Sequence, residues 1–142
     1  MNGVLDASMA LAWQFKRGDP VEAGLAEQAL RDLPSSSWLV PAIWHAEVAN
    51  AMLRGERAGL IQPSQSGFFL SRISHAAISV DSESPRTHLA GVLTLARLYR
   101  LTAYDATYLE LALRTGQVLA TFDRQLATAV RLAGGQVFGD GA

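Results

Sequence analysis

The stretch Val118-Leu-Ala-Thr-Phe-Asp123 contains the clearest strand signal in the sequence, and it ends on an acid. Its short apolar run predicts a buried strand over 118–122, and the following segment, 123–132, predicts a helix. The start of the chain has the same arrangement, because the apolar segment Gly3-Val-Leu-Asp6 also ends on an acid. A helix over 7–16 is expected to follow it.

The remaining elements continue this alternation of strands and helices. Helices are expected over 20–33, 42–58, 63–75, 85–100 and 105–114, and strands over 38–40, 77–81 and 136–138. Such alternation favours an α/β fold in which a parallel sheet has helices on both faces. In open sheets of this kind, ligands bind beyond the carboxyl ends of the strands. Functional side chains are therefore expected at that edge.

Composition limits the classes of protein to consider. The 142 residues fit one domain, and a hydrophobic fraction of 49% supplies a core. The absence of cysteine excludes disulfides and thiolate metal sites. No apolar run reaches the roughly 18–20 residues that span a bilayer, and the N-terminal segment lacks the basic region of a signal peptide. We therefore expect a cytoplasmic protein.

The net charge of −1 shows no basic excess of the kind typical of nucleic-acid binding. All the basic residues except Lys16 are arginines. Arginine matches phosphate groups bidentately, but codon usage in a GC-rich genome produces the same bias. Composition alone therefore leaves an RNA ligand open.

Four acids stand where the fold predicts function. Asp6 and Asp123 follow predicted strands, and Asp105 opens a predicted helix. Glu47 lies inside an otherwise apolar helix, with Asn50 on the same face three residues later. These positions make the four acids candidates for one shared site.

Each acid also has a structural interpretation. Asp6, Asp105 and Asp123 stand at helix starts, where a carboxylate can cap free amides. Glu47 could instead pair with Arg54 or Arg57, which follow it by seven and ten residues on the same helix. Considered singly, these positions do not require a catalytic role.

Considered together, the acids predict a cation site. Two carboxylates about 5 Å apart repel each other by roughly 3 kcal/mol at an effective dielectric constant near 20. Four converging acids must therefore take up protons or bind a cation, and an all-oxygen ligand set selects Mg²⁺ or Mn²⁺. Such an ion lowers the pKa of a bound water and neutralises a departing oxyanion. The predicted chemistry is metal-assisted phosphodiester cleavage.

Four sequence motifs contain the candidate acids and together cover almost the whole chain. They are Val4-Leu-Asp-Ala-Ser8, Pro41 followed by Glu47-Val-Ala-Asn-Ala-Met52, Tyr104-Asp-Ala-Thr-Tyr-Leu-Glu-Leu-Ala112, and Leu119-Ala-Thr-Phe-Asp-Arg-Gln-Leu126. In content and order they resemble the motifs of the PIN-domain family, and in particular those of its VapC toxins from bacterial toxin–antitoxin pairs.

The resemblance implies a single PIN domain over 1–142, built as a three-layer sandwich with a central parallel sheet. It also implies a Mg²⁺- or Mn²⁺-dependent endoribonuclease. The metal-binding, catalytic acids would be Asp6, Glu47, Asp105 and Asp123. The implied partners are an RNA substrate, a VapB-type antitoxin and a second copy of the chain in a homodimer.

The same resemblance assigns supporting roles to three polar residues. Ser8 and Thr121 would lie near the metal, and Asn50 would support the site from further out.

Other functions fit the sequence less well. A receiver domain needs a lysine after a late strand, and the only lysine is Lys16. A haloacid-dehalogenase-like phosphatase needs Asp-x-Asp, where this chain has Asp6-Ala-Ser8. A non-catalytic binding module with the same fold is the alternative from another class, and the four intact acids argue against it. These motifs do not distinguish a VapC toxin from a PIN nuclease outside the toxin group.

Overall fold

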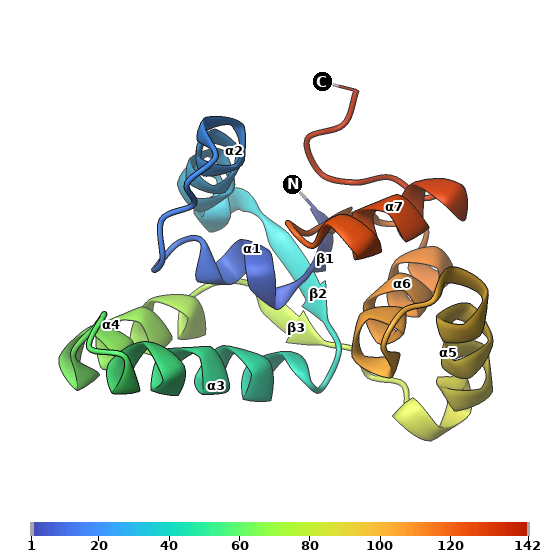
Figure 1. The fold of residues 1–142 in the computed structure, drawn as a ribbon, viewed down its shortest axis with the longest axis horizontal. Helices are drawn as coiled ribbons and strands as arrows, with labels where there is room; N and C mark the ends of the chain where they lie inside the picture. The colour runs from blue at the N-terminus through green and yellow to red at the C-terminus, as the bar shows by residue number, and fades with distance from the viewer. Residues whose placement is uncertain (1, 142) are drawn as a thin grey trace.

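The computed structural model describes residues 2–141 and contains a central parallel sheet (Figure 1). The strand order is β3-β2-β1-β4, with β1 in register between Ser37–Leu39 of β2 and Val118–Ala120 of β4. The strand bounds are β1 Asn2–Leu5, β2 Ser37–Val40, β3 Ile78–Val80 and β4 Val118–Ala120. All the pairings between these strands are parallel, as the alternation of elements predicts.

Seven α-helices within the described residues surround this sheet. Their bounds are α1 Ala7–Leu11, α2 Pro20–Arg31, α3 Trp44–Arg57, α4 Pro63–Ser74, α5 Pro85–Tyr99, α6 Ala103–Thr115 and α7 Arg124–Leu132, with a short 3₁₀ helix at Leu33–Ser35. From β1 the chain adds β2 and then β3 on one side, and it then crosses back to place β4 on the other side of β1. Because crossovers between parallel strands are right-handed, this reversal puts α1–α4 on one face of the sheet and α5–α7 on the other. Figure 1 shows this division. The predicted three-layer α/β architecture is confirmed.

Two predicted elements differ clearly in the structure. The helix expected over 7–16 ends at Leu11, and the chain then turns so that the indole N–H of Trp13 donates to the Ala26 carbonyl of α2 at 3.1 Å. The strand expected over 136–138 is a single bridge between Leu119 and Val137. It is followed by a positive-φ turn at Gly139 that ends the pairing.

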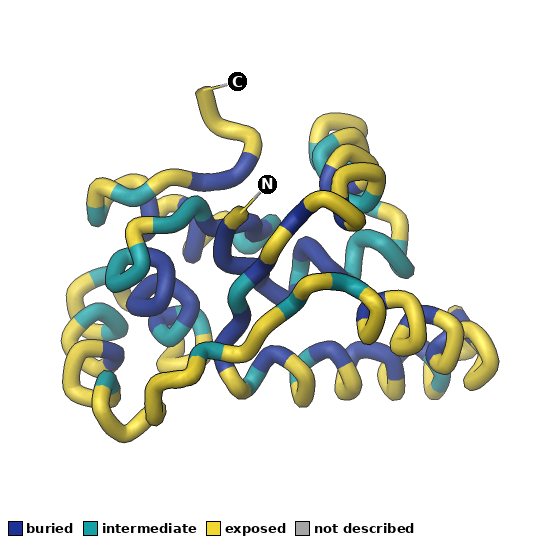
Figure 2. Tube along the Cα trace, turned by 180° about the vertical axis from the view of Figure 1, so that it is seen from behind, coloured by how far each residue is buried: buried dark blue, intermediate teal, exposed yellow. Residues whose placement is uncertain are grey.

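The core lies between the sheet and both helical layers. The strands contribute almost continuous apolar side chains, as expected for a parallel sheet covered on both faces. Trp38 and Leu119 of the sheet, and Trp44 and Leu126 of the helices, have at most 1% of their surface exposed. Strands β1, β2 and β4 are mostly buried, whereas the edge strand β3 is largely exposed, as is the outer surface of α3 (Figure 2). Within residues 2–141, no helix combines the length and hydrophobicity needed to cross a bilayer.

Gly3 provides a test of the sheet register. A methyl group added there would lie 2.7 Å from the Val118 carbonyl oxygen and 3.0 Å from the Trp38 ring. Because backbone cannot move aside easily, Gly3→Ala should lower the free energy of unfolding by about 1–3 kcal/mol. Gly24→Ala, which meets nothing within 4 Å on α2, should raise it by about 0.5–1 kcal/mol. Urea denaturation measures both values, and equal stability of the two variants would contradict the register.

Candidate active site

The carboxyl ends of β1 and β4 form the part of the sheet edge at which the candidate residues meet. The Asp6 amide donates to the Ala120 carbonyl at 3.0 Å, so the pairing continues one residue beyond β1. From here the chain leaves β1 toward one face and β4 toward the other. Open parallel sheets bind their ligands at such a divergence.

Asp6 is held by two hydroxyl groups. Its Oδ2 accepts hydrogen bonds from Ser8 Oγ at 2.7 Å and from Thr121 Oγ1 at 2.6 Å. Ser8 Oγ accepts from the Phe122 amide at 2.9 Å, and Thr121 Oγ1 accepts from the Asp123 amide at 3.0 Å. Because each hydroxyl is fixed by a backbone amide, one oxygen of this carboxylate has a defined position. The two predicted supporting residues therefore contact Asp6 directly.

Glu47 lies in the first turn of α3, and its partner comes from α6. The hydroxyl of the fully buried Tyr108 donates to Glu47 Oε1 at 2.5 Å. The structure thus gives Glu47 a tyrosine as partner in place of Arg54 or Arg57. Tyr108 was not predicted as a site residue, although its position one helical turn after Asp105 is a signal that could have identified it.

The capping interpretation holds for only one of the three aspartates. Asp123 Oδ1 accepts from the Leu126 amide at 2.8 Å and so caps α7. Asp6 occupies the N-cap position of α1 but makes no side-chain capping bond. The cap of α6 is Thr102, whose hydroxyl accepts from the Asp105 amide at 3.1 Å. Capping therefore does not account for Asp6 or Asp105.

The four carboxyl groups influence one another electrostatically. Burial, followed by the charges of Asp123, Asp6 and Glu47, raises the pKa of Asp105 to about 6. Burial raises the pKa of Asp6 despite its two hydroxyl donors, and Asp123 raises it further. Burial and the charge of Asp6 also raise the pKa of Glu47. We call these four residues the acidic cluster.

The acidic cluster matches a hard divalent cation in ligand type and charge, since it offers only carboxylate oxygens. Its side chains do not form a closed cage, because no three acids or histidines among residues 2–141 are placed to hold a metal ion directly. Mg²⁺ usually keeps several of its waters when bound to protein. The acidic cluster therefore fits a cation as an open site, in which water molecules would complete the coordination of the ion.

Asn50 is the one predicted supporting residue that the structure leaves outside these contacts. It lies on the exposed surface of α3, one turn after Glu47, and its side chain makes no hydrogen bond to another described residue. The geometry therefore gives it no role in holding the acids.

Comparisons with known proteins agree with this arrangement. The family model described as PIN domain matches residues 3–132. The chain is 30% identical over 130 residues to Ribonuclease VapC3 of Pyrobaculum aerophilum, covering 89% of this chain and 93% of that protein. The crystal structure of PAE2754 from the same organism has a TM-score of 0.67 at 24% identity, covering 92% of this chain and 94% of that one.

A more distant structure has the same fold. The crystal structure of FitAcB from Neisseria gonorrhoeae has a TM-score of 0.58 at 19% identity, and the match covers 97% of this chain and 96% of that one.

The raised pKa of Asp105 predicts a pH-dependent stability. Its pKa rises from 3.8 to about 6 on folding, so ionisation destabilises the folded state progressively between these pH values and fully above them. In EDTA, Asp105→Asn should therefore melt at a higher temperature than the wild type near neutral pH. The difference should vanish as the pH falls to about 4. Asp32→Asn, at an exposed acid, is the matched control in these melting curves. A variant no more stable than the wild type at neutral pH would contradict the electrostatic coupling.

Proposed function

Because this chain belongs to the PIN-domain family, we propose that its acidic cluster is the active site of a metal-dependent endoribonuclease. The observation that carries this proposal is the gathering of Asp6, Glu47, Asp105 and Asp123 at one sheet edge, where burial and the acidic neighbours together raise the pKa of Asp105 to about 6. The named ribonuclease among the relatives supports RNA as the substrate. The protein is proposed to act as the toxin of a VapC-type toxin–antitoxin pair.

The cation would be Mg²⁺ or Mn²⁺, held by the four acids in part through its own waters. When bound, the cation would lower the pKa of a water molecule and would neutralise the negative charge on the departing oxygen. Ser8 and Thr121 keep Asp6 Oδ2 in place through bonds of 2.7 and 2.6 Å. Tyr108 holds Glu47 from the opposite helical layer. These contacts fix the directions from which two of the four carboxylates would face the cation.

Two further interpretations stay open as alternatives. A PIN nuclease outside the toxin group would share this site and differ only in its partners. A non-catalytic binding module would keep the fold without needing the acids. The retention of all four acids, at a cost in electrostatic repulsion, favours a nuclease over a binding module.

Removing single members of the cluster tests the enzyme directly. Asp6→Asn and Asp123→Asn should each lower the rate of RNA cleavage by roughly 100-fold or more, equivalent to about 2.7 kcal/mol of transition-state stabilisation. Asparagine caps helices as well as aspartate does, so Asp123→Asn should keep α7 intact. Cleavage is followed on a labelled single-stranded RNA with Mg²⁺ or Mn²⁺ present, and EDTA should abolish it.

Asp32→Asn is the control for the same charge change away from the site. Equal cleavage by the wild type and by both cluster variants would indicate a contaminating nuclease or another site.

We also propose that an antitoxin covers the acidic cluster. A cluster of carboxylates without its metal is a favourable binding site for an arginine or lysine of a partner, since that cation relieves the same repulsion. The protein is proposed to form a homodimer as well, and the exposed side chains of Leu93 and Leu98 on α5 offer apolar surface for association.

Co-expression tests the toxin assignment. Expression of the wild-type chain alone should slow growth, whereas Asp6→Asn should not. A small DNA-binding protein encoded immediately upstream should restore growth and co-purify, because it covers the acidic cluster. Removal of the partner's basic residues should weaken this rescue. Harmless overexpression, with no co-purifying neighbour, would exclude the toxin role but leave the nuclease assignment in place.

A further inference from the structure

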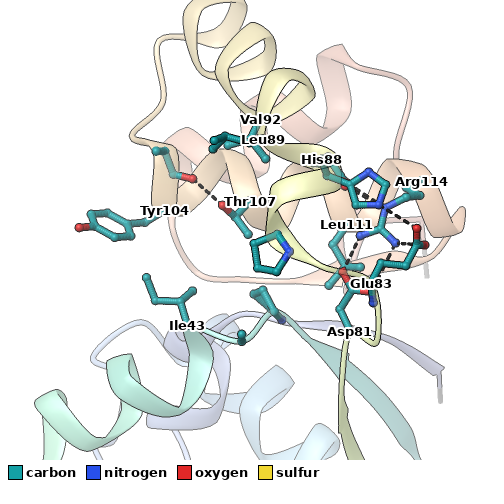
Figure 3. Close-up of a pocket in the computed structure, with 15 residues that line it drawn as sticks. Ile43, Asp81, Glu83, His88, Leu89, Val92, Tyr104, Thr107, Leu111 and Arg114 are labelled. Atoms are coloured by element: carbon teal, nitrogen blue, oxygen red, sulfur yellow. Dashed lines mark hydrogen bonds and ion pairs between the residues drawn. The ribbon is translucent and has the colours of Figure 1, made fainter.

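A second cavity lies beside the acidic cluster, between α5, α6 and the segment that leads into α3 (Figure 3). It has a volume of about 330 Å³, and its walls include Ile43, Leu89, Val92 and Leu111. Tyr104 lies at one end, and a group of charged side chains around Arg114 lies at the other (Figure 3). We call this cavity the α5–α6 pocket.

The α5–α6 pocket shares α6 with the acidic cluster. Tyr104, Thr107 and Leu111 line the pocket at spacings of three and four residues, so they form one stripe along α6. Asp105 and Tyr108 belong to the adjacent stripe, which faces the cluster. The first turn of α6 therefore separates the two sites. A ligand strand that crosses the cluster can place a neighbouring group in the pocket.

The charged end of the pocket is a closed network. Arg114 donates to Asp81 at 2.6 Å, to Glu83 at 2.7 Å and to Glu110 at 2.8 Å. His88 lies between two of these carboxylates, 3.0 Å from Glu83 and 3.4 Å from Glu110. Because Arg114 already neutralises part of the charge of all three acids, the charged end of the pocket is not a binding site for a further cation. The carboxylate oxygens that face the pocket still have lone pairs for neutral N–H donors.

The two ends of the pocket match two successive nucleobases of one strand, one at each end. The Tyr104 side chain is 60% exposed, and its ring can stack on a base of any sequence. The carboxylates repel a phosphate, so the part of a nucleotide that enters must be its base. A carboxylate accepts a hydrogen bond from the exocyclic amine of cytosine, whereas uracil presents a carbonyl oxygen at that position. Glu83 is suited to this contact because 52% of its side chain is exposed.

We propose that the α5–α6 pocket binds two successive bases of the RNA strand next to the cleavage site, with Tyr104 stacking on one base and Glu83 selecting an amino-bearing base over uracil at the other. This inference rests on the proposed ribonuclease function and adds a base preference to it. The preference is determined by residues outside the acidic cluster.

The test measures binding, so it does not depend on catalysis. Fluorescein-labelled 2′-O-methyl hexamers of cytidine and of uridine are titrated with the protein in Mg²⁺, and their anisotropy is followed. The hexamers are checked by gel to be intact afterwards. The wild type should bind the cytidine hexamer roughly tenfold more tightly, as expected for one base-specific contact. Glu83→Gln should reduce this ratio to about twofold or less.

A second variant separates stacking from selection. Tyr104→Ala should weaken the binding of both hexamers by a similar factor, roughly tenfold, because stacking does not distinguish bases. Glu27→Gln on α2 makes the same charge change as Glu83→Gln, and Phe68→Ala removes another exposed aromatic ring on α4. Neither control should change either affinity or the ratio between them. Thermal melting confirms that each variant is folded.

Equal affinity of the wild type for both hexamers, or a ratio unchanged by Glu83→Gln, would overturn the proposal while leaving the ribonuclease function intact. Failure to bind either hexamer would contradict both. A synthetic peptide of alternating leucine and arginine is titrated in parallel. If Tyr104→Ala weakens the binding of this peptide and of neither hexamer, the pocket is a protein-docking site and the proposal is wrong.

Discussion

Asp6 is a carboxylate with only 6% of its surface exposed, and the hydrogen bonds that stabilise it organise this edge of the sheet. Removing such a group from water costs several kcal/mol unless hydrogen bonds compensate. The hydroxyls of Ser8 and Thr121 provide part of that compensation, and each is itself fixed by a backbone amide after β4. The same contacts hold the β1–α1 connection against the β4–α7 connection. The hydrogen bonds that stabilise Asp6 therefore also hold Asp123 beside it.

The acidic cluster opposes the stability of the fold that carries it. Burial and mutual repulsion raise the pKa of Asp6, Glu47 and Asp105, so ionising them disfavours the folded state. Asp123 differs because it also caps α7, and its charge there favours the helix. Arg114 shows the contrasting arrangement, since the acids around it are compensated by a guanidinium and the pKa of Asp81 is lowered. The acids around Arg114 thus have a positive partner within the protein, whereas the acidic cluster has none among the described residues, which is why we propose the cluster as the cation site.

The sequence predicted the sheet and the place of the acids because both follow from local patterns. Apolar segments that end on an acid predicted β1 with Asp6 and β4 with Asp123 at the same edge. The contact between Tyr108 and Glu47 could not be predicted, since it joins residues 61 positions apart across two helical layers. The early end of α1 likewise depends on the bond of Trp13 to α2, which is a tertiary contact. The start of α6 was predicted at Asp105, but the N-cap of this helix is Thr102, three residues earlier.

The central claim is that four acids from separate parts of the chain form one cation site, and metal-dependent melting tests it most directly. Millimolar Mg²⁺ or Mn²⁺ should raise the melting temperature of the wild type, because a ligand that binds only the folded state stabilises it. Asp6→Asn should lose most of this increase, whereas Asp32→Asn should retain it. A wild-type melting temperature that does not respond to either metal, or an Asp6→Asn variant that responds as fully as the wild type, would contradict the account.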